Sequence, residues 1–216
     1  MNKGQCSFNG RRGIAALIVC MLSISLMNAQ PLKSFGIKGG ITLANQAWSY
    51  STSTTLETQN RMGTVVGIFV EGFRVSNFSM LAELWYQQKG FKTMVPSQSH
   101  PGEMESAAPQ LDYGSLAFSL KYKFPGDVLS PYLFAGPHWD LLGMTAKRGY
   151  KPAVTVNKVG NGDLGITGGI GSEFNIGIFK NVLAEFRYSP SLIDTFKDDT
   201  LSVKNNSIEF VVGISF

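Results

Sequence analysis

The chain has 216 residues, of which 44% are hydrophobic and 16% charged, and a formal net charge of +4. Three of its basic residues, Lys3, Arg11 and Arg12, stand before the first apolar run, so the rest of the chain is nearly neutral and offers no basic face for nucleic acid. Both cysteines, Cys6 and Cys20, lie in the same opening segment, which excludes disulfides and cysteine-ligated metal sites from the remainder.

The opening segment has the order of a secretory signal peptide. Basic residues precede an apolar run over residues 14–27, and the small polar stretch Asn28-Ala29-Gln30 follows. A membrane anchor is the alternative, but an apolar helix that spans a bilayer needs roughly 20 residues. We therefore predict a cleaved signal peptide over residues 1–29 and a single domain over residues 30–216.

The remaining chain shows apolar residues at every second position rather than at helical spacing. Each of eight such segments is about as long as the roughly 9 to 11 residues that a tilted strand needs to cross a bilayer. The predicted strands cover residues 34–43, 63–74, 78–90, 112–124, 131–142, 162–174, 181–189 and 207–216.

The connections between these segments alternate in length. The long ones cover residues 44–62, 91–111, 143–161 and 190–206, and the short ones cover 75–77, 125–130 and 175–180. In an up-and-down meander, every second connection lies at the same rim, and bacterial outer-membrane barrels have short periplasmic turns and long extracellular loops. The sequence therefore predicts an all-β fold, an eight-stranded antiparallel up-and-down transmembrane β-barrel with periplasmic termini.

Charged residues predict which face of each strand looks inward, because an ionised side chain facing lipid at mid-membrane is costly. In the last segment, an inward Glu209 leaves the alternate side chains from Ile208 to Phe216 for lipid. In the fifth, His138 and Asp140 indicate an inward face, and Pro137 predicts a β-bulge or the end of the strand. The predicted charged residues of the lumen are Lys38, Glu71, Glu83, Lys89, Lys121, Glu173, Glu185, Arg187 and Glu209.

Four cations and five carboxylates inside so narrow a barrel favour a structural network of ion pairs that fills it. The alternative is a catalytic or proton-carrying cluster of Glu71, Glu83 and Glu185, but no nucleophile accompanies it in the sequence. His138 would fit a lipid-modifying enzyme only with a nucleophile beside it on the outer surface. We expect no catalytic residue, no metal site and no cofactor.

Five stretches carry a family resemblance: FGIKGGITLAN, MLAELWYQQKG, YGSLAFSLKYKF, PYLFAGP and LAEFRYSPSLID. They resemble the PorT-type outer-membrane barrel family of Bacteroidetes, and the resemblance covers essentially all of residues 30–216. The resemblance implies an outer-membrane location in a Gram-negative cell. It also implies that the terminal aromatic, Phe216, is part of the signal read by the barrel-assembly machinery.

Three functions remain open from the sequence. The first is a non-enzymatic barrel that contacts outer-membrane lipid and binds envelope proteins through its long loops. The second is an accessory component of a protein secretion system, as the resemblance implies. The third is a soluble lipocalin-like carrier of a small ligand, which would need an apolar lumen and a polar exterior.

Overall fold

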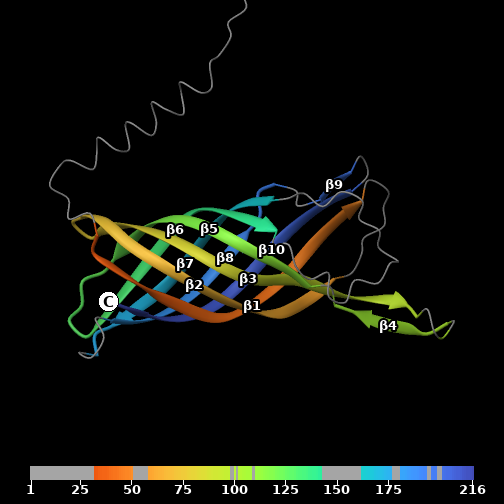
Figure 1. Ribbon diagram of the computed structural model, residues 1–216, viewed down its shortest axis with the longest axis horizontal. Helices are drawn as coiled ribbons and strands as arrows, with labels where there is room; N and C mark the ends of the chain where they lie inside the picture. Colours follow the sequence, from red (N-terminus) through yellow and green to blue (C-terminus); the bar gives the residue numbers. More distant parts are fainter. Residues whose placement is uncertain are drawn as a thin grey trace, which may run out of the picture.

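The fold is described by a computed structural model (Figure 1). It covers residues 32–50, 58–97, 100, 102–108, 110–142, 162–176, 181–193, 196–198 and 201–216. The predicted signal peptide, residues 1–29, lies outside the described residues. None of the described residues form a helix long and apolar enough to span a bilayer.

Ten antiparallel strands make up the described structure. Eight of them correspond to the predicted segments, and β4 and β9 are short additions. The strands are β1 (Ser34–Tyr50), β2 (Gln59–Val75), β3 (Phe78–Pro96), β4 (Met104–Ala107), β5 (Gln110–Lys123), β6 (Leu129–Leu142), β7 (Gly162–Phe174), β8 (Asn181–Pro190), β9 (Phe196–Asp198) and β10 (Leu201–Ser215).

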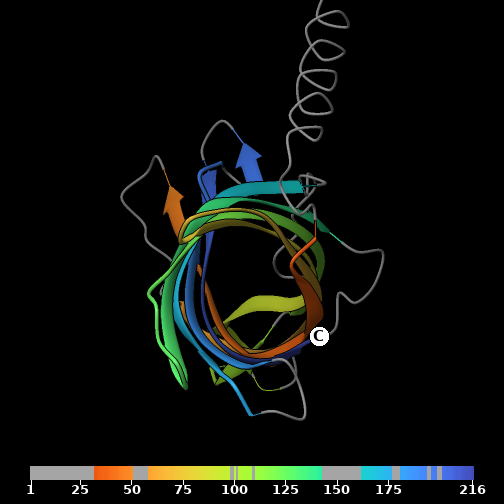
Figure 2. The same ribbon diagram turned by 90° about the vertical axis from the view of Figure 1, so that its left-hand side faces the viewer.

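The sheet closes on itself, which confirms the predicted eight-stranded barrel. Each long strand pairs with its neighbour in the chain, and β1 also pairs with β10 from Gly36↔Ser215 to Tyr50↔Leu201. Viewed along its length, the sheet forms a continuous ring (Figure 2). A closed ring leaves no exposed sheet edge among the barrel strands, as a structure in lipid requires.

Exposure alternates along the strands as predicted. In β10, Phe210 and Val212 are 47% and 64% exposed, whereas Glu209 and Val211 are almost fully buried. Outward apolar side chains cover residues 208–216, from β10 to the terminal Phe216, and residues 78–86 of β3, and we call this band the apolar belt. Each of these two segments is nine residues long, which matches the roughly 9 to 11 residues of a transmembrane strand.

Four strands are longer than predicted and extend the barrel beyond the apolar belt. β1 continues to Tyr50, β2 begins at Gln59, β3 continues to Pro96 and β10 begins at Leu201. Beyond the belt the outward positions of β10 are polar, as Lys204 and Asn206 illustrate. The predicted loops 44–62, 91–111 and 190–206 are therefore partly strand, and β4 pairs with the extension of β3 as a projecting hairpin (Figure 1).

The bulge or strand end predicted at Pro137 is wrong. The register between β5 and β6 is the same on both sides of this residue, since Ala117 pairs with His138 and Leu120 with Ala135. Proline has no N–H group, so the ladder to β5 loses pairs locally. The strand continues because its other ladder, to β7, keeps pairing through Pro137.

The two ends of the barrel differ in their connections. The two-residue turn Ser76-Asn77 and the segment 124–128 lie at one end, together with Phe216 (Figure 1). We call this the short-turn end and the opposite one the long-connection end. At the short-turn end Phe216 pairs with Phe35 of β1: its N–H donates to the Phe35 carbonyl at 2.8 Å.

Glycines on the inner face make room for large lumen side chains. Gly67 lies directly opposite Trp85, and a Cβ added at Gly67 would lie 2.6 Å from the indole ring and 2.6 Å from the carbonyl oxygen of Leu84. A side chain at Gly67 would have to push the backbone of β3 away from β2 and also displace the indole ring of Trp85.

We expect Gly67→Ala to lower the free energy of unfolding by about 1 to 3 kcal/mol, the usual range for overpacking. The matched control is Gly114→Ala, because a Cβ at Gly114 meets no atom within 4 Å, and its effect should stay within about 0.5 kcal/mol. Urea unfolding in lipid vesicles measures both. Equal effects of the two substitutions would contradict the packing described.

Candidate functional site: the charged lumen

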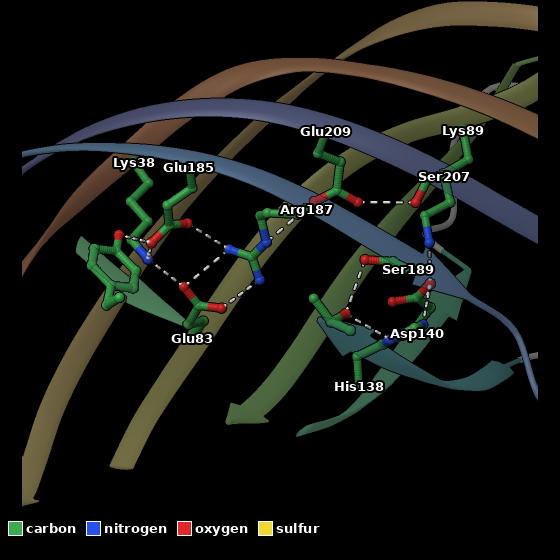
Figure 3. Close-up of polar contacts among 12 residues, drawn as sticks. Lys38, Glu83, Lys89, His138, Asp140, Glu185, Arg187, Ser189, Ser207 and Glu209 are labelled. Atoms are coloured by element: carbon green, nitrogen blue, oxygen red, sulfur yellow. Dashed lines mark hydrogen bonds and ion pairs between the residues drawn. The ribbon is translucent and has the colours of Figure 1, made fainter. Parts of the chain in front are cut away.

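All nine charged residues predicted for the lumen lie inside the barrel. They come from seven strands, and each is at most 6% exposed. The structure brings them into a central cluster and a second group at the short-turn end, while Lys89 lies toward the long-connection end. Figure 3 shows the central and long-connection groups.

Arg187 of β8 is the centre of the network. Its guanidinium donates to both carboxylate oxygens of Glu83, at 3.1 and 2.6 Å, in a bidentate pair. It also lies 3.3 Å from Glu185 and 3.5 Å from Glu209. The ring of Trp85 stacks against it, with 4.7 Å from Cζ to the ring centroid. A planar cation that is always charged suits such a fork and stack better than lysine would.

Lys38 of β1 closes the central cluster on the side facing the short-turn end. Its Nζ lies 2.7 Å from Glu83 and 2.6 Å from Glu185, so it shares both carboxylates with Arg187. The hydroxyl of Tyr132 donates to Glu185 at 2.6 Å. The cluster thus joins β1, β3, β6 and β8 across the lumen by charge-assisted hydrogen bonds, which are the strong kind.

A second cluster lies at the short-turn end. Lys121 bridges Glu71, at 2.9 Å, and Glu173. The other oxygens of these carboxylates are approached by two lysines nearer the rim: Lys33 lies 2.5 Å from Glu71, and Lys123 lies 2.5 Å from Glu173. Three lysines therefore share two glutamates, and the two outer lysines are only partly buried.

Toward the long-connection end the lumen holds carboxylates that sequence reasoning left out of the predicted set. Lys89 pairs with Asp140 at 2.6 Å, and Asp140 lies directly opposite Asp163 of β7. Asp163 accepts hydrogen bonds from Ser191 and from Asn205, the latter at 3.0 Å. The sequence already placed Asp140, with His138, on the inward face of its strand, although Asp140 was not among the nine charged residues predicted for the lumen. Asp163 follows a glycine at the very start of its strand, where the face is harder to assign.

His138 lies inside the barrel rather than on its outer surface. Its Nδ1 is 2.9 Å from the hydroxyl of Thr167, which in turn is 2.9 Å from that of Ser189. The three side chains are at most 4% exposed, so a lipid substrate outside the barrel has no contact with them. In the part of the chain that the structure describes, no group of three or more His, Cys, Asp or Glu side chains is arranged to hold a metal ion.

The comparisons with known proteins agree with the architecture. The sequence pattern of a family described as the outer membrane protein beta-barrel domain matches residues 14–216. No curated protein matches the chain. Among solved structures, OprG from Pseudomonas aeruginosa is similar with a TM-score of 0.52 at 12% identity, covering 86% of this chain and 97% of OprG.

Two further structures match with lower scores. Ail of Yersinia pestis has a TM-score of 0.43 at 13% identity, covering 85% of this chain and 98% of Ail. Neisserial surface protein A has a TM-score of 0.46 at 15% identity, covering 85% of this chain and 99% of Neisserial surface protein A. At such identities the likeness concerns the fold alone.

The family match covers nearly the whole chain, and the barrel is closed with an apolar exterior. The chain therefore belongs to the outer membrane protein beta-barrel domain family and is an integral barrel of the outer membrane.

Proposed function

We propose that this barrel is a non-enzymatic membrane protein with a sealed lumen, which acts by presenting its long-connection end to partners outside the cell. The observation that carries the proposal is the lumen network, in which Arg187 and Lys38 tie carboxylates of facing strands together at the centre. An interior filled by paired side chains leaves no wide path for solutes. We therefore assign the function to the surfaces that lie outside the membrane.

The difference between the two ends supports an orientation with the short-turn end in the periplasm. Outer-membrane barrels carry short turns on the periplasmic side and longer loops outside. The short-turn end holds Phe216, whose position is consistent with a role in recognition by the assembly machinery. At the opposite end β1, β2, β3 and β10 extend past the apolar belt. This extension would stand clear of the lipid and is the surface we assign to partner binding.

The hairpin of β3 and β4 is the most prominent part of that surface (Figure 1). Its strands pair from Thr93↔Ala107 to Pro96↔Met104. Met94 and Met104 are exposed on it, and a flexible thioether side chain adapts to varied partners. We assign envelope proteins as the partner class for this hairpin.

An accessory role in protein secretion is the second candidate. It is supported by the resemblance of stretches such as MLAELWYQQKG to the PorT-type family, and it uses the same exposed surface. Deleting the gene and comparing the secreted proteins tests it: a changed set supports the role, and an unchanged set removes it. The lipocalin-like alternative does not fit, because the lumen is charged and the exterior apolar.

Two measurements test the proposal. The protein should remain in the membrane after carbonate washing, and unboiled samples should migrate differently from boiled ones on a detergent gel. Extraction by carbonate would contradict an integral barrel, and identical migration would contradict a closed one. A planar-bilayer recording should show no stable large conductance, whereas a steady open pore would contradict a sealed lumen.

Orientation needs a separate test. An epitope tag inserted at His100, in the β3–β4 hairpin, should be labelled by antibody on intact cells. The matched control is the same tag at Gly126, in a short connection, which should be labelled only after the outer membrane is permeabilised. The opposite pattern would reverse the assigned orientation.

A further inference from the structure

A small polar cavity of about 290 Å³ lies at the short-turn end, at the mouth of the lumen. Its polar lining comes mainly from Lys33, Arg74, Asn77, Lys123, Asp127 and Ser130. Arg74 belongs to β2 and Asn77 to the turn that follows it, while Lys33 is the residue before β1. Lys123 ends β5, Asp127 lies in the connection after it, and Ser130 is in β6. The cavity is separate from the paired charges at the centre of the lumen, and the proposed function does not use it.

Arg74 is presented to this cavity by an irregular piece of backbone. The pairing of β2 with β3 shifts register between Gly72 and Val75, which marks a β-bulge. Two non-glycine residues beside Arg74 have positive φ angles, Phe73 at 51° and Ser76 at 55°. Left-handed backbone at such residues is uncommon and costly, and bulges at barrel rims often re-aim a side chain.

The guanidinium of Arg74 is held in place on one side only. Its Nε donates to the carbonyl oxygen of Ser76 at 3.1 Å, within the same turn. That single contact fixes the plane of the group while its terminal amines make no other hydrogen bond or ion pair among the described residues. A guanidinium oriented in this way offers two parallel N–H donors, the fork that recognises phosphate or carboxylate.

The charges around the cavity favour an anion. Lys33, Arg74 and Lys123 supply three cations to its lining, against one carboxylate, Asp127. Lys33 is paired with Glu71 and Lys123 with Glu173, and Lys121 shares both of these carboxylates. The four cations Lys33, Arg74, Lys121 and Lys123 therefore stand against the three carboxylates Glu71, Glu173 and Asp127, a formal charge of +1.

We infer that this cavity binds a phosphate-sized oxyanion, with Arg74 as the bidentate anchor and Lys33 and Lys123 as flanking cations. The inference rests on the proposed orientation only for the compartment that supplies the ligand, which is the periplasm. The phosphate could be a free ion or phosphomonoester, or the headgroup of a lipid in the adjacent leaflet. Both share the same chemistry at Arg74.

The test uses the full-length barrel folded in a detergent that contains no phosphorus. Inorganic phosphate is titrated in one arm and a short-chain phosphatidic acid in the other, and binding is followed by NMR at the Arg74 side chain and the Asn77 amide. We expect saturable shifts at both groups. Arg74→Gln should weaken binding about tenfold or more, as expected for the loss of charge-assisted hydrogen bonds.

The matched control is Lys92→Gln, which removes the same charge from an exposed position at the long-connection end and should leave binding within about twofold. Saturable binding of phosphate alone identifies a free oxyanion as the ligand, and of the lipid alone a headgroup. If neither probe shifts these groups, or Arg74→Gln binds as tightly as the native chain, the inference is overturned. Loss of the heat-dependent gel mobility would instead overturn the barrel itself, so the two failures are distinguishable.

Discussion

Replacing Arg187 with leucine is expected to lower the free energy of unfolding by about 3 to 5 kcal/mol, the cost of breaking a buried ion pair from one side. The substitution leaves Glu83, Glu185 and Glu209, each at most 6% exposed, without their shared partner. Lys38 remains paired with Glu83 and Glu185, which reduces the loss of stability. Urea unfolding of the barrel in lipid vesicles measures the change.

Two further variants make this result interpretable. Lys92→Leu removes an exposed cation at the long-connection end and should change stability by no more than about 0.5 kcal/mol. Adding Glu83→Gln to Arg187→Leu removes one stranded carboxylate and should recover part of the loss. A loss below about 1 kcal/mol for Arg187→Leu would show that the network does not stabilise the barrel.

Val212→Arg is expected to destabilise the barrel by about 2 to 4 kcal/mol, the cost of arginine at the bilayer midplane. Val212 is the central outward residue of the apolar belt on β10 and is well exposed. A guanidinium there has no partner in hydrocarbon and must draw water or headgroups toward it.

The control lies on the same face of the same strand. Asn206→Arg is also outward but stands beyond the apolar belt, so its cost should be about 0 to 1 kcal/mol. Val211→Arg should also destabilise the barrel, but through steric crowding, since Val211 packs with Val65 and Trp85 inside the lumen. If Val212→Arg and Asn206→Arg destabilised the barrel equally, the result would contradict the depth assigned to the apolar belt.

Much of the barrel follows from the sequence because lipid and lumen impose opposite chemistries on alternate residues. Within the apolar belt this contrast sets the strands and their faces, and β7 has the bounds that its pattern predicts, residues 162–174. Beyond the belt the outward face is polar, and most inward side chains are polar too, although they stay buried, so the alternation of apolar and polar residues disappears from the sequence. The stretch Lys204-Asn205-Asn206 is polar at every position, so the start of β10 at Leu201, ahead of the predicted residue 207, carried no signal.

The partners within the lumen were not predictable. Arg187 and Glu83 are separated by 104 positions, and their meeting depends on the relative stagger of strands around the ring. The alternation rule fixes which side chains point inward but not which ones lie at the same height. For the same reason β4 was missed, because MESA becomes a strand only through pairing with the extension of β3.

Contact between side chains and lipid tests the central claim most directly. In nanodiscs, nuclear Overhauser effects to acyl-chain protons should appear for the methyl groups of Val212 and be absent for those of Val211, its neighbour in the chain. This result is expected of a closed barrel with hydrocarbon outside and paired charges within. Acyl-chain contacts at Val211, or equal contacts at both residues, would contradict it.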